Sequence, residues 1–284
     1  MKKTSEKKRF DLLSPLLRLL TWSAAALTTL IVLYLVGYIL IKGVPHLTPS
    51  LFAWTYTSEN VSLTPALVNT LLMTLLALLL SAPLGICSAV FLVEYAKRGS
   101  KVVKVIRLAS ETLAGIPSIV YGLFGLIFFV VTMHWGYSIL AGGFTLAIMV
   151  LPLIMRTTEE ALLSVPDTYR EGAFGLGAGR LRTVFRIVLP AAVPGILAGI
   201  ILAVGRVVGE TAALIFTAGT LAQIPKSPLE SARTLSVHMY NLSSEGLHIN
   251  QTYATAVVLM LLVLGINALS SALARMLGGG KSSK

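Results

Sequence analysis

Apolar runs that are long enough to cross a lipid bilayer recur along this sequence and determine its fold class. A helix needs about 20 apolar residues to span a hydrocarbon core about 30 Å thick. Six runs meet this requirement, and they are Leu16–Ile41, Ala66–Val93, Thr112–Met133, Tyr137–Met155, Ala191–Ala218 and Tyr253–Leu277. Only helices and closed barrels satisfy their backbone hydrogen bonds in lipid, and the runs lack the alternation typical of barrel strands. The sequence therefore predicts an all-α polytopic membrane protein with six transmembrane helices.

Composition agrees with a membrane protein. Charged residues make up 12% of the 284 residues, and the mean hydropathy is +0.83. Soluble domains have about 25% charged residues. The first apolar run is longer than the 7–15 residues of a signal-peptide core, so we interpret it as an uncleaved first span.

Basic residues predict the orientation of the spans. If the N-terminus lies inside, 19 of the 23 Lys and Arg residues fall on the inner side, three fall in outer loops, and Arg206 lies within a span. Lys and Arg are enriched in cytoplasmic segments of membrane proteins. Both termini are therefore expected inside. The net charge of +11 is then mainly an orientation signal, and no nucleic-acid partner is expected.

Apparent motifs for nucleotide, metal and redox chemistry have the wrong spacing. The C-terminal GGGKSS ends like a phosphate-binding P-loop, but Arg275 stands where that motif requires its first glycine. The four histidines lack metal-ligand spacing, and the single Cys87 is expected to be a small buried apolar side chain. The sequence thus predicts no cofactor, no metal site and no enzymatic activity in this chain.

The spans divide the chain into segments. We expect a basic cytoplasmic N-terminus at residues 1–15, the first transmembrane helix and an outer loop at 16–65, a transmembrane core at 66–277 and a cytoplasmic tail at 278–284. Within the core, the charged segment 156–190 connects the fourth and fifth spans on the inner side.

This charged segment contains the stretch REGAFGLGAGRLRTVFRIVLP, from Arg170 to Pro190. Its small residues and glycines predict a short helix, a glycine-hinged turn and a second amphipathic helix that re-enters the membrane at Pro190. Such helices at the membrane interface transmit force from a cytoplasmic partner to the spans. A solvated connecting loop with a chance glycine cluster is the other interpretation, and the residue pattern alone leaves both open.

The spacing of this stretch resembles the EAA loop of bacterial ABC importer permeases. Six residues fall on the family pattern, and they are Glu171, Ala173, Gly177, Ile187, Leu189 and Pro190. Gly172 departs from it, because an alanine is usual there. Glycine lowers helix propensity by about 1 kcal/mol, so the first short helix is expected to be looser. The resemblance implies that this coupling-helix loop docks in a cleft of a separate ATPase subunit.

Three stretches resemble, more closely, the inner-membrane permease of the phosphate-specific importer. They are GIPSIVYGLFGL (Gly115–Leu126), EEALLSVPDTYREGAFGLGAGR (Glu159–Arg180) and GRVVGETAAL (Gly205–Leu214). The resemblance runs from about Ala66 to the C-terminus. It implies a subunit of an ATP-driven importer that moves inorganic phosphate across the bacterial inner membrane. The implied partners are a homologous permease subunit in a heterodimer, two cytoplasmic ATPase subunits, a periplasmic phosphate-binding protein and membrane lipid.

Arg206 and Glu210 place two charges inside the fifth apolar run. At 1.5 Å per residue, Arg206 lies about 22 Å along a helix that begins at Ala191. One such charge costs about 2.5–3.5 kcal/mol to insert. The four-residue spacing predicts that both charges share one helical face, next to Gly205 and Gly209, which allow close approach of another backbone. An intrahelical ion pair that only permits insertion and a contact with substrate both remain open.

If the pair contacts substrate, Arg206 offers a planar donor fork that matches two phosphate oxygens. Glu210 accepts from the O–H group that phosphate retains near neutral pH and that sulfate lacks, which favours phosphate. Ser118 and Tyr121 either line the same substrate path or pack between helices. Arg156 and Glu159, at the inner end of the fourth span, either mark the exit or flank the membrane.

Other functions also stay open from the sequence. A permease for another oxyanion, such as molybdate or sulfate, has the same loop. A passive anion channel needs a basic residue in a span but no EAA loop. An intramembrane enzyme needs a catalytic pair or metal ligands within spans, and no His or Asp is placed for that role.

Overall fold

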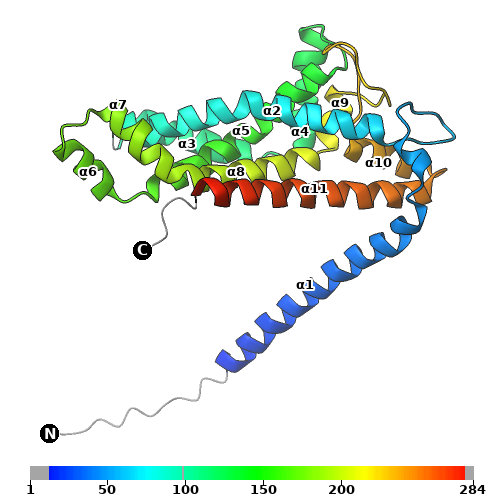
Figure 1. The fold of residues 1–284 in the computed structure, drawn as a ribbon, viewed down its shortest axis with the longest axis horizontal. Coiled ribbons are helices and arrows are strands. Elements are labelled where there is room, and N and C mark those ends of the chain that lie inside the picture. The colour runs from blue at the N-terminus through cyan, green and yellow to red at the C-terminus, as the bar shows by residue number, and fades with distance from the viewer. Residues whose placement is uncertain (1–12, 98, 279–284) are drawn as a thin grey trace.

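The computed structural model describes residues 13–97 and 99–278, and this part of the chain contains helices and loops without any strand (Figure 1). Most of the expected N-terminal segment 1–15 and of the tail 278–284 lies outside the described residues. In chain order the helical elements are α1 (Leu13–Gly43), the 3-10 turns η1 (Val44–His46) and η2 (Pro49–Phe52), α2 (Thr64–Val90), the π-helical turn η3 (Phe91–Tyr95), α3 (Lys101–Ala114), α4 (Ser118–Gly125), the π-helical turn η4 (Leu126–Thr132), α5 (Ile139–Leu163), α6 (Asp167–Gly175), α7 (Arg180–Thr183), the π-helical turn η5 (Val184–Val188), α8 (Leu189–Val208), α9 (Ala212–Thr217), α10 (Leu235–Glu245) and α11 (Ile249–Gly278).

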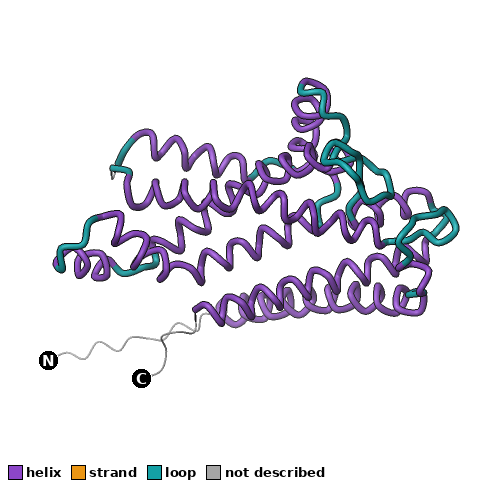
Figure 2. The backbone as a smooth tube through the Cα atoms, turned by 45° about the horizontal axis from the view of Figure 1, so that its top comes forward, coloured by secondary structure: helices purple, strands orange, loops and turns teal. Residues whose placement is uncertain are grey.

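The predicted fold class is confirmed. Within the described residues, five helices are long and apolar enough to cross a membrane, and a bent pair of helices makes a sixth when the pair is counted as one span. The five are Ser14–His46, Thr64–Tyr95, Ile139–Leu163, Arg180–Val208 and Ile249–Ala272. An even number of spans returns the chain to the end at which it started, and Figures 1 and 2 show α1 beginning and α11 ending toward the same end of the molecule.

The third span differs from its prediction. A single helix was expected over Thr112–Met133, but α3 ends at Ala114 and α4 starts at Ser118, with a bend of 99° between the two segments. Pro117 explains the break, because proline lacks the N–H that a helix interior needs and disfavours helical geometry in the residue before it. The third span is therefore a broken one, and α3 supplies its first half.

Helices α2, α5 and α8 form the centre of the bundle, and small residues let them approach closely. A Cβ added at Gly85 of α2 would lie 2.9 Å from the Ile154 side chain of α5, and one added at Gly195 of α8 would lie 2.7 Å from Ala161 of α5. The main core cluster, which includes Met73, Leu146 and Ile154, lies among these helices. Close packing of small residues is the usual way in which membrane helices associate.

Helix α1 lies outside this bundle. No part of its membrane-spanning window is buried, and it contacts the described chain mainly through α11 and η1. Figure 1 shows α1 leaving the bundle at an angle. Its large apolar side chains are exposed, as expected for a surface that faces lipid or a partner subunit. Cys87 of α2 is exposed as well, so the prediction of a buried thiol is wrong.

We name the two ends of the bundle by what they carry. The cap end carries α10 and the segments 44–63 and 220–248, and the loop end carries α6 and α7 (Figure 1). At the cap end, the start of α2 fixes the long segment that precedes α10. The Asn69 amide donates to the carbonyls of Gln223 and Arg233, at 2.8 and 3.1 Å, and the Thr70 hydroxyl accepts from the N–H of Leu235 at 2.8 Å.

Arg233 and His238 are both buried at the cap end, against one aromatic ring. The Arg233 guanidinium lies 4.6 Å from the centroid of the Tyr56 ring, and His238 lies edge-on to the same ring at 6.1 Å. Burial, followed by the charge of Arg233, lowers the pKa of His238 from 6.5 to about 3. His238 is therefore neutral in the folded protein at neutral pH.

We expect the protein to lose stability as the pH falls below 6.5. Unfolding returns the pKa of His238 to its ordinary value, so the unfolded chain binds one more proton than the folded chain between pH 6.5 and about 3. Within this window, each pH unit lowers the free energy of unfolding by about 1.4 kcal/mol. Thermal unfolding of the detergent-solubilised protein at neutral and mildly acidic pH measures the loss. The variant His238→Gln does not titrate and should lose most of this dependence, whereas an unchanged dependence would assign it to another group.

Candidate substrate-path and coupling site

Arg206 lies in the last turn of α8 and is half-buried. The helix ends at Val208, so the predicted shared helical face of Arg206 and Glu210 is wrong. Glu210 instead belongs to the break before α9, where its Oε1 accepts a hydrogen bond from the N–H of Ala213 at 3.1 Å. This contact satisfies one of the N–H groups that the start of α9 leaves free, and it is the physical reason for the different position of the carboxylate. The fifth apolar run, expected as one helix over Ala191–Ala218, is therefore broken at this point.

The two charges do not pair with each other in the described part of the chain. Ion pairs there join Arg107 to Glu159, Arg156 to Glu160, and Arg170 to Glu94 and Asp167. Arg206 also makes no hydrogen bond within residues 13–97 and 99–278. Its position at the end of α8 lets the free carbonyls of the last turn stabilise its positive charge. The geometry does not support an intrahelical ion pair, and it leaves the guanidinium donors available.

The glycines beside Arg206 face open space within this chain. A Cβ added at Gly205 would meet nothing within 4 Å, and one at Gly209 would meet only the Gly205 carbonyl at 3.6 Å. The expected close approach occurs elsewhere, at Gly122, where an added Cβ would lie 2.8 Å from the Cα of Ala213. This contact packs α4 on α9, so the sequence stretches GIPSIVYGLFGL and GRVVGETAAL, distant along the chain, meet in space.

Tyr121 and Ser118 lie on α4, beside this contact. Tyr121 is buried, and its hydroxyl donates to the Leu113 carbonyl at 2.7 Å, which bridges the break between α3 and α4. Ser118 is half-buried and its hydroxyl makes no hydrogen bond to the described residues. The structure thus brings Arg206, Glu210 and Tyr121 to neighbouring breaks in the third and fifth spans.

Arg156 and Glu159 lie on α5, nearer to the loop end. Arg156 pairs with Glu160 at 3.1 Å, with both side chains exposed, and Glu159 pairs with Arg107 of α3. A cleft of about 230 Å³ lies among these residues. Thr157 packs on Gly199, seven residues before Arg206, so this group lies about 10 Å further along α8 toward the loop end. The structure does not bring Arg156 and Glu159 together with Arg206.

The charged segment forms the predicted helix–turn–helix. α6 ends at Gly175, the turn contains Gly177 at a φ of +81°, and α7 starts at Arg180. Ala173 is buried, while Glu171 and Gly172 are exposed. A Cβ added at Gly172 would meet nothing within 4 Å, so the alanine that is usual there would fit. Gly177 is the position at which glycine is required, because a positive φ is unfavourable for residues with a side chain.

The second helix begins at Arg180 and continues through Pro190. Residues Arg180–Val208 form one continuous helical span, made of α7, η5 and α8, so the predicted second helix runs directly into the fifth span, and its entry into the membrane at Pro190 stays a prediction. The proline is accommodated because the wide π-helical turn η5 precedes it, and such turns relieve the clash between a proline ring and the carbonyl four residues earlier. Ile187 and Leu189 are half-buried on this span. A single helix therefore runs from the coupling loop to Arg206.

Large apolar side chains are exposed around the turn. Leu176 is 92% exposed and Leu181 is 66% exposed, and Tyr169 and Phe174 are about half exposed. A group of exposed apolar side chains rimmed by polar residues marks a surface that contacts another protein or the membrane. The loop end therefore presents an interaction surface formed by α6, the turn and α7.

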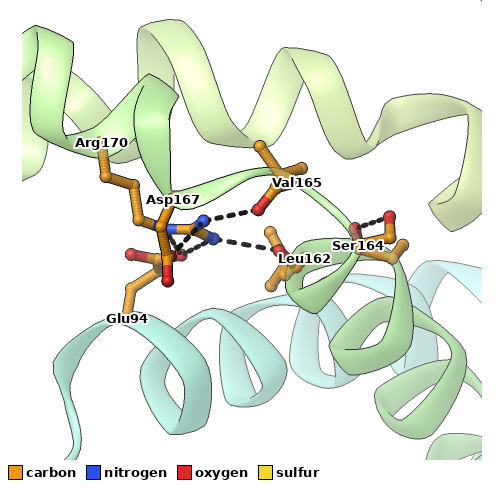
Figure 3. Close-up of polar contacts among 7 residues, drawn as sticks. Glu94, Leu162, Ser164, Val165, Asp167 and Arg170 are labelled. Atoms are coloured by element: carbon orange, nitrogen blue, oxygen red, sulfur yellow. Dashed lines mark hydrogen bonds and ion pairs between the residues drawn. The ribbon is translucent and has the colours of Figure 1, made fainter.

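The sequence analysis missed two residues at the loop end, Arg170 and Glu94. Figure 3 shows the guanidinium of Arg170 directed at Glu94, with Asp167 and the carbonyls of Leu162 and Val165 around it. Arg170 directly precedes Glu171 in the motif, which is the one sequence signal for it. Glu94 lies 76 residues away along the chain, and no pattern links the two.

A family model described as the binding-protein-dependent transport system inner membrane component matches residues 81–280. Among curated relatives, the chain is 37% identical over 241 residues to a Bacillus subtilis protein named probable ABC transporter permease protein YqgI, covering 78% of this chain and 81% of that protein. It is 33% identical over 248 residues to a Methanocaldococcus jannaschii protein named probable phosphate transport system permease protein PstA, covering 85% and 87%. It is 34% identical over 210 residues to the phosphate transport system permease protein PstA of Mycobacterium leprae, covering 73% and 68%.

Solved structures share the fold. A chain of a bacterial alginate ABC transporter superposes with a TM-score of 0.66 at 18% identity, covering 96% of this chain and 99% of that one. A chain of the MetNI methionine ABC transporter, in an inward-facing conformation, superposes with a TM-score of 0.60 at 20% identity, covering 75% and 93%. At these identities the likeness concerns the arrangement of the helices.

Gly177 and Gly179 form a matched pair for testing the turn. Neither faces a neighbouring atom within 4 Å, but Gly177 has a φ of +81° and Gly179 a φ of −72°. We expect Gly177→Ala to weaken the turn by about 1–2 kcal/mol, because a Cβ is strained at positive φ. Local opening then makes hydrogen exchange of the α6 and α7 amides about 5- to 30-fold faster. Gly179→Ala should leave exchange nearly unchanged, and equal effects of both substitutions would contradict the role of backbone strain.

Proposed function

Because this chain belongs to the binding-protein-dependent transport system inner membrane components, the permease subunits of ABC importers, we propose that it moves inorganic phosphate across the inner membrane. Two relatives described above have names that assign them to phosphate transport. The proposed assembly is a heterodimer with a homologous permease subunit. Two ATPase subunits bind the loop end, and a periplasmic phosphate-binding protein delivers the anion at the cap end.

The observation that supports phosphate as the substrate is the environment of the Arg206 side chain. It is a half-buried cation inside a membrane span, and it has no carboxylate partner or hydrogen bond in the described chain. A charge in a span is costly unless it acts on a substrate or is paired. Its planar fork matches two oxygens of a phosphate. The open space at Gly205 leaves this part of α8 accessible to the substrate and to the second permease subunit.

Glu210 supplies the proposed discrimination between phosphate and sulfate. Its Oε1 is held by the Ala213 N–H, which fixes the carboxylate beside the break and leaves Oε2 free to accept another hydrogen bond. Phosphate near neutral pH has an O–H group to donate, whereas sulfate has none. A sulfate ion would therefore meet an uncompensated negative charge. Ser118 lies on the neighbouring α4, and its hydroxyl, which makes no hydrogen bond to the described residues, is the proposed third contact. Tyr121 holds the break between α3 and α4 through its hydrogen bond to the Leu113 carbonyl.

The proposed orientation places the loop end in the cytoplasm. The described basic residues Lys97, Arg107, Arg156, Arg170 and Arg180 line the clefts at this end, in agreement with the positive-inside rule. The exposed apolar side chains around Gly177 are the proposed contact with the ATPase, through Glu171, Gly172 and Ala173 on α6. Ile187, Leu189 and Pro190 lie on the continuous helix that links this contact to Arg206. Arg156, Glu159 and the cleft beside them are the proposed exit.

Reconstituted complexes test the substrate. We expect ATP-driven uptake of labelled phosphate that excess sulfate does not inhibit. Replacing both Arg206 and Glu210 by leucine should preserve assembly but lower uptake by about 10- to 100-fold, the loss typical of a charge-assisted contact. Arg206→Lys should also transport poorly, because an ammonium group does not reproduce the two-pronged contact.

Glu210→Gln is the matched variant for selectivity. It removes the negative charge and keeps the side-chain size, so it should weaken phosphate uptake and admit sulfate. A complex that works without its binding protein is needed, since that protein filters anions first. Normal phosphate uptake by the apolar double variant would reject the substrate path, and uptake of molybdate or sulfate in place of phosphate would reassign the substrate.

Single cysteines test the orientation. In a Cys87→Ser background, Lys101→Cys on α3 should react with a membrane-impermeant maleimide only from the cytoplasmic side, and Lys226→Cys at the cap end only from outside. Lys101 is the first residue of α3 and Lys226 lies in the segment before α10, and both side chains are exposed. Reaction of Lys101→Cys from outside would invert the proposed topology.

A further inference from the structure

Arg170 is the residue that connects the coupling helix to two other elements. Its side chain is 14% exposed, and it donates to Glu94 Oε1 through Nη2 at 2.7 Å and through Nε at 3.1 Å. It also donates to the carbonyls of Leu162 and Val165 at 3.0 and 2.8 Å, and to Asp167 at 3.2 Å. Figure 3 shows these acceptors around one guanidinium. All three guanidinium nitrogens are therefore in use.

The acceptors belong to the ends of two membrane spans. Glu94, whose side chain is 8% exposed, lies in η3, the last turn of the second span. Leu162 belongs to the last turn of α5, and Val165 lies two residues after the end of that helix. Carbonyls at a helix C-terminus have no partner within the helix and favour a cation. One side chain on α6 thus joins the second span and the fourth span, which pack against each other at the centre of the bundle.

Among the described residues, α6 makes few backbone contacts with these two spans. Its main backbone contacts are with α7 and η5, on the other side of the turn. Between α6 and the end of α2 lies a cleft of about 760 Å³, whose lining includes Lys97, Arg107 and Arg180 as well as Arg170. The coupling helix is therefore not packed closely on the second span. The Arg170–Glu94 pair bridges one side of this cleft.

We propose that Arg170 and Glu94 are positioning residues that transmit the movement of the coupling helix to α2 and α5 when the ATPase acts. This inference rests on the proposed coupling function. α6 precedes the glycine turn, and α7 leads directly into the span of Arg206. A force on the loop therefore reaches α8 through the backbone and α5 through the packing of α8 on α5, and Arg170 links α6 directly to the ends of α2 and α5 as well. With the pair intact the three central helices respond together to the coupling helix, and without it the response of α2 and α5 becomes smaller.

Arginine is required in this role because of its shape. Its planar fork presents donors in fixed directions to the carboxylate and to the two carbonyls, whereas lysine presents one compact ammonium group. Arg170→Lys keeps the charge but loses most of the contacts. Glu94→Gln keeps the shape but loses the ion pair. The double variant Arg170→Met/Glu94→Leu removes both charges, so that no buried charge is left without a partner.

The experiment uses the complete importer with its ATPase subunits in lipid vesicles, and it has two readouts. The first is the number of substrate ions moved per ATP hydrolysed, which should fall by about 5- to 150-fold in all three variants, the range typical of coupling between sites. ATP hydrolysis and assembly should persist. The second is the mobility of a spin label on Cys87, the single cysteine, which is exposed on α2. ATP should change this mobility clearly less in the variants than in the wild type. Lys104→Gln, which removes an exposed and unpaired charge from α3 of the same end, is the control and should behave as wild type.

The outcomes separate coupling from other roles. The spin label depends on ATP and not on the transported ion, so it tests the pair even if phosphate is the wrong substrate. The proposal would be overturned if ATP did not change the mobility of the label in the wild type. It would also be overturned if the variants kept both the wild-type label response and the wild-type number of ions moved per ATP. Failure of all three variants to assemble would give the pair a folding role instead. A double apolar variant with normal coupling would show that the pair only neutralises charge.

Discussion

Backbone hydrogen bonding inside a hydrocarbon layer is the constraint on which the rest of this structure depends. An unpaired N–H or C=O in lipid costs several kcal/mol, so the spans are helices and each interruption needs its own compensation. The third span is interrupted at residues 115–117, and the Tyr121 hydroxyl donates to the Leu113 carbonyl there. The fifth is interrupted after Val208, where Glu210 accepts from the Ala213 N–H and its own carbonyl accepts from Ser236 at 2.6 Å. The polar side chains of these stretches are thus partly explained by the breaks they stabilise.

The breaks also determine where a polar solute can be held within the membrane. Helix ends leave free backbone groups, and side chains next to them sit in a more polar environment than the middle of an intact helix. Gly122 packs on Ala213, which brings the two breaks together. Arg206 is stabilised by the end of α8, and the break allows Glu210 to turn away from it. An unbroken helix would have forced the two charges onto one face, where they would neutralise each other and leave no free donor for an anion.

The sequence predicted the class of fold, the approximate positions of the spans and the helix–turn–helix of the loop. These features follow from hydropathy and from glycine placement, which are local properties. It did not predict the breaks, because hydropathy averages over about 20 residues and does not register a change of direction within an apolar run. The effect of Pro117 was readable, since proline disfavours helix in the residue before it, but the apolar character of the run concealed it. The Arg170–Glu94 pair was beyond sequence analysis, because its acceptors include two backbone carbonyls and a residue 76 positions away.

Arg170 and Arg206 have the same guanidinium group but differ in how many of its donors are bonded. Arg170 has all of its donor nitrogens engaged by acceptors from three elements, and a saturated guanidinium holds parts of a protein in fixed relation. Arg206 has no partner in the described chain, and an unsaturated guanidinium in a span is stable only if a ligand, water or another subunit supplies acceptors. The first arrangement suits transmission of force, and the second suits binding of an anion that must also leave. Because both side chains belong to elements that meet at the turn around Gly177, a displacement of that turn reaches them together. In the proposed coupling, movement at the loop end alters the surroundings of Arg206, while the contacts of Arg170 link α6 to the ends of α2 and α5.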